Sequence, residues 1–224
     1  MPKILVTGAN GFLGKEVVKL LNKNDYDFAG VGRNISTSSK LLCDLSIPAD
    51  VIKLLEETNP KIIINLAASV DFQEKNQYPL FPVNTLLPAI FAGYCTKNNS
   101  HLIQSSSIIV HGFLHRHYSK KTELTPDTAY GKSKLLADDI IIASGCKASI
   151  LRIGGIFGDN GSLHLGINKA IVEAKKGNPP NIVNTGSAKR NYIFVKDVAL
   201  AIIDTVKERL TGIHYLGGET KTIK

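Results

Sequence analysis

The stretch Thr7-Gly8-Ala9-Asn10-Gly11-Phe12-Leu13-Gly14 decides the fold of this chain. Its three glycines are spaced three apart, directly after the apolar run Ile4-Leu5-Val6 and before a segment whose pattern predicts a helix over 12–21. In such a strand-to-helix turn, glycines make the tight bend, let the backbone approach a pyrophosphate and allow close helix–strand packing. The helix N-terminus adds N–H groups for phosphate. We therefore expect a dinucleotide site here, the alternative being an ordinary turn; its residues are Gly8, Asn10, Gly11, Phe12, Leu13 and Gly14.

Short apolar runs alternate with amphipathic segments of helical length along the rest of the chain. Runs such as Ile62-Ile63-Ile64 do not alternate with polar residues, which is typical of strands buried on both faces. This alternation predicts an α/β fold with a Rossmann-type, doubly wound parallel sheet. The expected strands are 4–7, 28–31, 62–66, 102–105 and 149–153, and the expected helices are 12–21, 49–57, 85–97 and 128–143.

The regular alternation of strand-like and helix-like segments weakens after Gly158, which suggests that the chain has two parts. Residues 1–158 are expected to form the dinucleotide-binding domain with the catalytic residues. Residues 159–224 are expected to form a partial substrate-binding lobe interleaved with the last strands of the sheet. Within it we expect helices at 167–176 and 197–209, strands at 192–195 and 212–216, and the start of a capped helix at 220–224.

Composition excludes several classes of protein. The chain has 224 residues and a formal net charge of +8, but its Lys and Arg residues are scattered, so we expect no nucleic-acid partner. Its three cysteines are odd in number and include no C-x-x-C pair, which argues against a disulfide framework or zinc site and for the cytoplasm. No apolar run approaches the roughly 20 residues of a membrane span, so we expect no membrane association.

Arg33 bears on the choice of cofactor. Proteins that bind NAD tend to carry an acidic residue at the end of the second strand, where it meets the ribose hydroxyls. Here that strand is followed by Gly32-Arg33-Asn34. A cation at this point suits a 2′-phosphate and favours NADP(H) over NAD, the alternative being a solvated surface arginine.

Tyr130 and Lys134 are candidates for proton transfer. They are four residues apart in a helix-forming stretch, so they share one helix face. A nearby ammonium stabilises tyrosinate, so we expect Lys134 to lower the pKa of Tyr130 and fit it for acid/base work on a carbinol or carbonyl oxygen. Upstream, a strand ends at Ser105-Ser106-Ser107, where a hydroxyl could bond the same oxygen or merely end the strand.

Taken together, these motifs resemble the extended short-chain dehydrogenase/reductases, and more closely the NAD(P)-dependent epimerase/dehydratase family that acts on nucleotide sugars. The resemblance covers 3–218 almost continuously. The motifs that carry it are T-G-x-x-G-F-x-G, Asn65-Leu66-Ala67-Ala68, the serine cluster followed by Val110-His111-Gly112, Tyr130-Gly131-Lys132-Ser133-Lys134, Arg152-Ile153, and the stretch from Arg190 to Val198.

The resemblance implies roles for particular residues. Tyr130 would be the catalytic acid/base, Lys134 would hold the nicotinamide ribose, and Ser107 would polarise the substrate oxygen. Arg190 would grip the substrate diphosphate, unless it is only part of a surface ion pair. Further cofactor contacts are implied for Arg33, Asp44 and Leu45 (the latter two at the adenine), Leu66, Ala67, Ala68, Asn84, Ser105 and Ile153, with Asp44 and Asn84 as helix caps being the alternative; further substrate contacts are implied for Ile108, His111 and Gly155.

The chain departs from the family pattern in four places. Ile108-Ile109 stand where dehydratases carry an acidic pair, which disfavours 4,6-dehydration. His111 replaces a usual tyrosine, and Gly155 replaces an asparagine that often contacts substrate in epimerases. The chain also ends early, which predicts either a compact substrate lobe or a truncated one. His111, His115 and His117 lack carboxylates at ligand spacing, so no metal is expected.

The sequence thus predicts an NAD(P)-dependent nucleotide-sugar epimerase or keto-sugar reductase. The short link between Arg33 and Asp44 resembles the dTDP-4-dehydrorhamnose reductase branch, whereas 189–197 looks more like an epimerase. The alternative is a non-catalytic NADP(H)-binding regulatory or assembly subunit of the same fold. A nucleotide-sugar substrate and a homodimer formed through the helix of Tyr130 complete the expectation.

Overall fold

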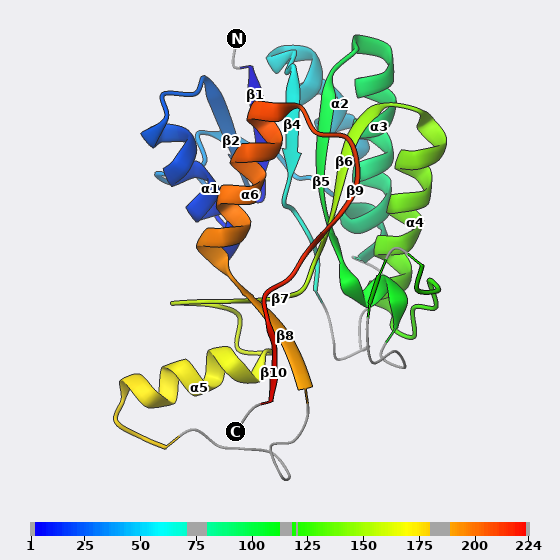
Figure 1. Cartoon of the computed structure of the whole chain (residues 1–224). Helices are drawn as coiled ribbons and strands as arrows, with labels where there is room; N and C mark the ends of the chain where they lie inside the picture. The colour runs from blue at the N-terminus through cyan, green and yellow to red at the C-terminus, as the bar shows by residue number, and fades with distance from the viewer. Residues whose placement is uncertain (1–2, 71–79, 113–117, 120, 180–188, 223–224) are drawn as a thin grey trace.

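A computed structural model describes residues 3–70, 80–112, 118–119, 121–179 and 189–222 (Figure 1). The core of the fold is a seven-stranded sheet in the order β3-β2-β1-β4-β5-β6-β9, with every neighbouring pair parallel. This confirms the predicted Rossmann-type sheet. Its strands are β1 (Ile4–Thr7), β2 (Phe28–Gly32), β3 (Leu41–Leu42), β4 (Ile62–Asn65), β5 (His101–Ser107), β6 (Lys147–Ile153) and β9 (Gly212–Leu216).

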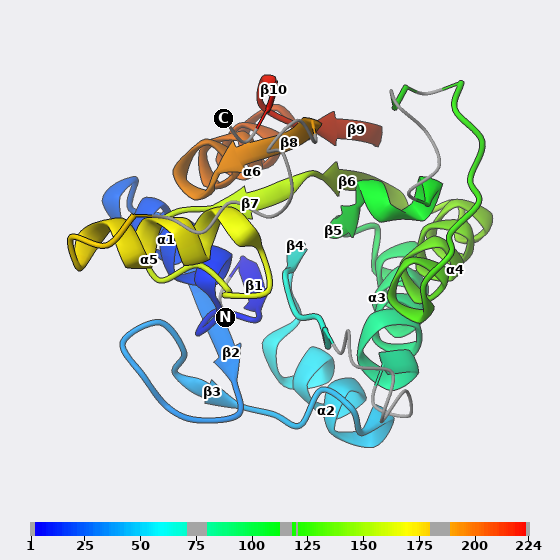
Figure 2. The ribbon, with the colours of Figure 1, turned by 90° about the horizontal axis from the view of Figure 1, so that it is seen from below.

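Helices cover both faces of this sheet (Figure 2). On one face α1 (Phe12–Lys23) and α6 (Val195–Glu208) pack on alternate side chains of β1 and β4, such as Val6 and Ile64. On the other face α2 (Pro48–Thr58), α3 (Leu87–Asn98) and α4 (Ala129–Ser144) pack on the intervening side chains, such as Leu5 and Ile63. Both faces of the central strands are therefore buried, which explains their uninterrupted apolar runs.

The direction in which successive strands are added to the sheet reverses between β1 and β4. Strands β2 and β3 lie on one side of β1, while β4, β5, β6 and β9 extend on the other. Ligands of open α/β sheets bind beyond the carboxyl ends of the strands at such a switch point. The glycine-rich turn follows β1 directly, so it lies at this point.

A second, smaller sheet lies beyond the carboxyl ends of the main strands (Figure 1). It has the order β10-β8-β7, with β7 (Gly155–Phe157) parallel to β8 (Lys189–Phe194) and β10 (Thr220–Thr222) antiparallel to it. The helix α5 (Gly166–Lys175) lies beside this sheet. Between β8 and β10 the chain returns to the main sheet to form α6 and β9.

Two sequence predictions need correction. The expected helix beginning at 220 is the strand β10, because its backbone pairs with β8, Thr220 lying opposite Asn191. Asn191 also donates from Nδ2 to the Gly218 carbonyl at 2.5 Å, which fixes the approach to this strand. The helix expected from 85 is preceded by a π-helical turn (η1, Pro82–Leu86), which the sequence pattern does not reveal.

Candidate active site

The glycine-rich turn is packed so tightly that side chains are excluded from it. Gly8 has φ +66°, and a Cβ there would lie 2.8 Å from the Ala67 nitrogen at the end of β4. A Cβ on Gly14 would lie 2.1 Å from the Gly8 carbonyl oxygen. Both contacts are with backbone, so a side chain at either position requires the main chain to move. The turn is thereby held against β4 at the switch point.

The N-terminus of α1 is open to a ligand. Gly11 is its exposed N-cap, no side chain caps the helix, and its first turn carries no acidic residue. Helix N–H groups without a side-chain partner, next to backbone that lacks Cβ atoms, fit a pyrophosphate. Phe12 and Leu13 are partly buried, and the Phe12 ring comes within 3.3 Å of the position of a Cβ on Gly158.

Arg33 is exposed just after β2 and lies close to Asp44. Hydrogen bonds from the Ser46 hydroxyl and N–H, at 2.6 and 2.9 Å, lower the pKa of the Asp44 carboxyl, and the Arg33 charge lowers it further. Asp44 therefore forms a local turn ahead of α2 but does not cap that helix, whose N-cap is Ile47 with no side-chain hydrogen bond. Its neighbour Leu45 is partly buried against the core; contact of either residue with adenine stays a prediction.

A buried polar ladder joins the ends of three strands beneath the switch point. The Thr7 hydroxyl donates to Asn65 Oδ1 at 2.5 Å, and Asn65 Nδ2 donates to Gln104 Oε1 at 2.8 Å. These residues are neighbours across β1, β4 and β5. Because every donor and acceptor in this ladder is buried, the ladder fixes the chain that continues into Leu66, Ala67 and Ala68. The sequence reading assigned no role to the ladder.

Asn84 clamps the segment after β4 to α4. Its side-chain amide exchanges hydrogen bonds with the backbone of Ser69, at 2.8 and 2.9 Å, and donates to the Ser133 hydroxyl at 3.1 Å. Asn84 is fully buried in the π-helical turn, a local widening that is frequent at functional sites. The structure thus places Asn84 near Lys134, as expected, but its amide contacts protein; the predicted ribose contact stays untested.

Tyr130 and Lys134 occupy one face of α4, next to the end of β5. The helix begins at a Thr128 cap whose hydroxyl accepts from the Gly131 N–H at 3.0 Å. Lys134 is only 1% exposed, and its Nζ donates to the Ser105 carbonyl at 3.0 Å and lies 5.9 Å from the centre of the Tyr130 ring. The Ser105 hydroxyl in turn donates to the Asn65 carbonyl at 2.9 Å, tying the pair to the sheet.

The pKa values of this pair differ from the sequence expectation. Burial lowers the pKa of Lys134 to about 8, although the carboxylate of Asp138 opposes that shift. Burial and then the Asp138 charge raise the pKa of Tyr130 to about 12, so the predicted lowering by Lys134 does not occur in this structure. The reason is that the ammonium is directed at the Ser105 carbonyl, while removal from water penalises the tyrosinate.

Ser107 ends β5 and caps a short 3₁₀ turn (η2, Ile108–His111). Its hydroxyl oxygen accepts from the Ile109 N–H at 3.3 Å, which leaves the hydroxyl proton available to an acceptor. This turn packs on the start of α4, since a Cβ on Gly131 would lie 2.9 Å from the Ile109 carbonyl oxygen. The fold therefore brings the segments of Ser107 and Tyr130 together, with partly exposed Ile108 beside them.

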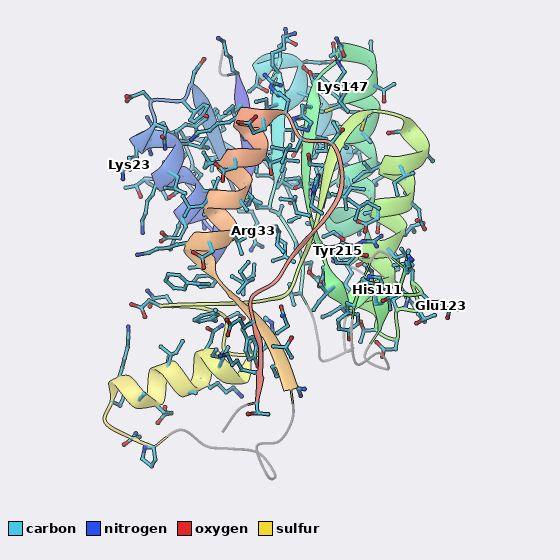
Figure 3. All side chains as sticks on the ribbon, viewed as in Figure 1. Lys23, Arg33, His111, Glu123, Lys147 and Tyr215 are labelled. Atoms are coloured by element: carbon cyan, nitrogen blue, oxygen red, sulfur yellow. The ribbon has the colours of Figure 1, made fainter. Side chains whose placement is uncertain are left out.

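His111 is fully buried, so its placement does not support the expected contact with substrate. One ring nitrogen, Nδ1, bonds the Glu123 carbonyl at 2.8 Å, and Nε2 bonds the Tyr215 hydroxyl at 2.9 Å. Figure 3 shows His111, Tyr215 and Glu123 gathered in one part of the molecule. The histidine that replaces the usual tyrosine therefore connects the turn after Ser107 to β9.

A buried ion pair between α4 and β6 was not predicted from the sequence. Asp138, one helical turn after Lys134, accepts from Arg152 Nε at 3.0 Å and from the Ser106 hydroxyl at 3.0 Å. The two charged side chains are 0% and 4% exposed. Arg152 also donates to the Tyr215 hydroxyl at 2.9 Å. The spacing of Asp138 from Lys134 was the available sequence signal; Tyr215 carried none.

The remaining predicted substrate residues lie toward the small sheet. A Cβ on Gly155 would lie 2.7 Å from the Tyr192 ring, so the missing side chain makes room for that ring. Arg190 on β8 is exposed and lies near Tyr118. Burial and the Asp127 charge raise the pKa of Tyr118, and the Arg190 charge opposes that rise.

Ile153, predicted as a cofactor contact, is buried in the core at the end of β6, opposite Ser107.

The described residues contain neither a metal-binding cluster nor a membrane-spanning helix. Within them, no group of three His, Cys, Asp or Glu side chains could hold a metal ion. His115 and His117 lie outside the described residues. In the same part of the chain, no helix is both long and apolar enough to cross a bilayer.

A family model described as the NAD dependent epimerase/dehydratase family matches residues 4–215. The chain belongs to this family. Two curated relatives are a probable dTDP-4,6-dihydroxy-2-methyloxan-3-one 4-ketoreductase of Streptomyces antibioticus, 28% identical, and the methionine adenosyltransferase 2 subunit beta of Danio rerio, 30% identical. Each alignment covers 70% of this chain but only 52% and 49% of those proteins, so the chain spans about half of their length.

Solved structures of the epimerase/dehydratase type share the fold over nearly the whole chain. A UDP-N-acetylglucosamine 4-epimerase from Bacillus cereus, 26% identical, superposes with a TM-score of 0.84 and covers 99% of this chain and 78% of its own. A hypothetical dTDP-4-dehydrorhamnose reductase from Sulfolobus tokodaii, 24% identical with a TM-score of 0.83 and coverages of 99% and 78%, agrees in fold.

Proposed function

We propose that this chain is a nicotinamide-dependent nucleotide-sugar enzyme, an epimerase or a keto-sugar reductase, and that the reductase is the better fit. The observation that carries the proposal is the position of Tyr130 and Lys134 on one face of α4, with Lys134 Nζ 3.0 Å from the Ser105 carbonyl at the end of β5. That strand end faces the same crevice as the glycine-rich turn. Acid/base groups thus lie beside a place suited to a pyrophosphate.

The residues present divide the chemistry among them. When bound, the nicotinamide ring supplies the hydride for a sugar carbon. Tyr130 gives its hydroxyl proton to the substrate oxygen, and Ser107 donates a hydrogen bond to the same oxygen. Lys134, charged below its pKa of about 8 and held at the Ser105 carbonyl, holds the ribose of the nicotinamide.

Reduction suits this site better than epimerisation. A tyrosine with a pKa of about 12 is protonated at neutral pH, and this is the form that a carbonyl reduction consumes. Epimerisation also requires the tyrosinate, to take a proton from the carbinol. Ile108 and Ile109 offer no proton for water elimination. The names of a curated dTDP-4-dehydrorhamnose reductase from Aggregatibacter actinomycetemcomitans and of the Streptomyces relative support the same direction.

NADP(H) is the proposed cofactor, because exposed Arg33 follows β2 where an acidic residue would favour NAD. We further propose that residues 159–224, which include α5, β8 and β10, form a partial substrate-binding lobe, with exposed Arg190 at the substrate diphosphate. A cytoplasmic homodimer formed through α4 remains a prediction; the exposed side chains of Leu136 and Ile142 on that helix support it.

The test measures NADPH absorbance at 340 nm with a panel of nucleotide-linked keto sugars. Reductase activity predicts consumption of NADPH equal to the product formed. Product formation without net loss of NADPH would identify an epimerase and overturn the proposal that the chain is a reductase. The same assay with NADH tests the cofactor preference, and faster turnover with NADH would overturn that part.

Gly14 offers a separate test of the dinucleotide site. Gly14→Ala places a Cβ 2.1 Å from the Gly8 carbonyl oxygen, so we expect the turn to shift at a cost of about 1–3 kcal/mol. Binding of NADPH, measured by titration calorimetry, should weaken at least roughly tenfold. The matched control is Gly93→Ala in α3, where a Cβ meets nothing within 4 Å and binding should not change. Equal binding by both variants would contradict the assignment.

A second candidate function is a non-catalytic NADP(H)-binding subunit. It is favoured by the resemblance to the methionine adenosyltransferase 2 subunit beta. It predicts dinucleotide binding without turnover on any sugar of the panel, and no change in binding on Tyr130→Phe. Turnover that depends on Tyr130 would exclude it.

A further inference from the structure

The segment after Arg33 folds back onto β2, and two glycines permit this. A Cβ on Gly30 would lie 1.9 Å from the Ser38 carbonyl oxygen, and the Lys40 N–H donates to the Gly30 carbonyl at 3.1 Å. A Cβ on Gly32 would lie 2.6 Å from Asn10 Nδ2. The segment 34–40 therefore lies against the strand end, with its backbone close to Gly30 and the side chains of Asn10 and Ser39 close to Gly32.

Asn10 joins this segment to the glycine-rich turn. Its Nδ2 donates to the Asn34 carbonyl at 2.9 Å, and its Oδ1 accepts from the Ser36 hydroxyl. The glycine-rich motif predicts that Asn10 contacts the cofactor directly. In the structure both ends of its amide bond the chain that follows Arg33.

Ser36 organises the rest of the segment. Its hydroxyl oxygen accepts from the N–H groups of Ser38 and Ser39, at 3.0 and 3.1 Å, while its own N–H donates to the Ser39 carbonyl at 2.9 Å. The buried Ser39 hydroxyl donates to the Asn34 carbonyl at 2.7 Å. The Asn34 carbonyl, next to Arg33, is thus held from both sides.

We propose that the Asn10–Ser36 pair is a positioning device that sets Arg33 at a fixed distance from the pyrophosphate turn and thereby determines selectivity for NADP(H) over NAD(H). The inference rests on the proposed cofactor. Selectivity is a difference between two affinities, and only the 2′-phosphate distinguishes these two ligands. A guanidinium gains most from a phosphate when its direction is fixed beforehand, because less freedom is lost on binding.

The charges around Arg33 are compatible with this role. Asp44 is close enough for the Arg33 charge to act on it, but its Oδ1 already accepts two hydrogen bonds from Ser46. Neither Asn10 nor Ser36 is charged, so their removal changes geometry and leaves the electrostatics of the site intact.

The experiment compares dissociation constants of NADPH and NADH for the full chain by titration calorimetry. We expect the wild type to prefer NADPH, and Asn10→Ala and Ser36→Ala each to reduce the ratio of the two constants by roughly tenfold, through weaker NADPH binding. Ser36→Thr keeps the hydroxyl and should retain the ratio. The matched control is Thr37→Ala, an exposed neighbour for which the structure describes no side-chain hydrogen bond.

The outcomes separate the inference from the proposed function. Binding of neither dinucleotide by the wild type overturns both. A wild type that binds without preferring NADPH overturns the inference and the proposed cofactor preference, and leaves the proposed dinucleotide-dependent activity standing. The inference is also overturned if Asn10→Ala and Ser36→Ala weaken the binding of NADPH and NADH equally. It is overturned as well if these two variants keep the wild-type ratio of dissociation constants while Arg33→Ala abolishes the preference for NADPH. The melting temperature of each variant should equal that of the wild type. A lost preference for NADPH then comes from a change in the segment 34–40 and not from loss of the fold.

Discussion

Tyr130→Phe is expected to lower turnover by a factor of about 10²–10⁴, the usual contribution of a positioned acid or base. The ring is only partly buried at the start of α4, and Phe keeps its shape, so the fold should be unchanged. Affinity for NADPH should stay within about threefold, because the glycine-rich turn and Arg33 are untouched. Steady-state kinetics together with calorimetric titration measure both quantities. Turnover that survives the substitution would refute the assignment of Tyr130.

The pH dependence of the wild type provides a companion test. Lys134 has a pKa of about 8, so its ammonium is present below pH 8 and is lost as pH rises through that value. We expect kcat/KM, which reports the free enzyme, to fall over the same interval. In Lys134→Met the rate should be lower throughout and this alkaline limb absent. A wild-type profile that stays level from pH 7 to 9.5 would show that the ammonium is not needed.

Breaking the buried ion pair should have the largest effect on stability. Asp138→Ala leaves the Arg152 guanidinium, 4% exposed, without its carboxylate, and loss of one partner of a buried pair costs about 3–5 kcal/mol. For a chain of this length, each kcal/mol corresponds to a fall in Tm of roughly 2–4 °C. Urea unfolding measures the free-energy change. A loss below about 1 kcal/mol would mean that Arg152 finds another partner in the variant.

A double-mutant cycle separates pairing from burial. Asp138→Leu with Arg152→Met removes both charges, so its cost should be far smaller than the sum of the two single changes. The matched surface control is the exposed pair Lys53–Glu57, 3.9 Å apart, where Lys53→Ala should change stability by less than about 1 kcal/mol. Additive effects of the two core substitutions would contradict a coupled pair.

Much of the fold could be predicted because its signals are local. The five strands and four helices expected before residue 158 form with shifts at their ends, and the sheet order places the glycine-rich turn where that motif predicts. The strands β3, β7 and β10 were missed. They are two or three residues long and exist only because a distant segment pairs with them.

The parts of the candidate site that depend on local spacing could also be predicted. Tyr130 and Lys134 share a face because the helix repeat requires it, and Ser107 is the last residue of β5, in the serine cluster where the sequence predicted that a strand ends. The roles of His111 and Asn10 could not be predicted. Their partners, Tyr215 and Ser36, are 104 and 26 residues away, and nothing near them in the sequence indicates the pairing.

The sequence by itself determined the class of this protein. Gly8, Gly11 and Gly14 encode a strand–turn–helix unit, since backbone approach and helix geometry depend on residues a few positions apart. Only the tertiary structure decided the state of the site. It raised the pKa of Tyr130, turned Lys134 toward Ser105 and engaged Asn10 with the chain after Arg33. Burial and hydrogen-bond partners are properties of the packed chain, and they exist only once distant segments meet.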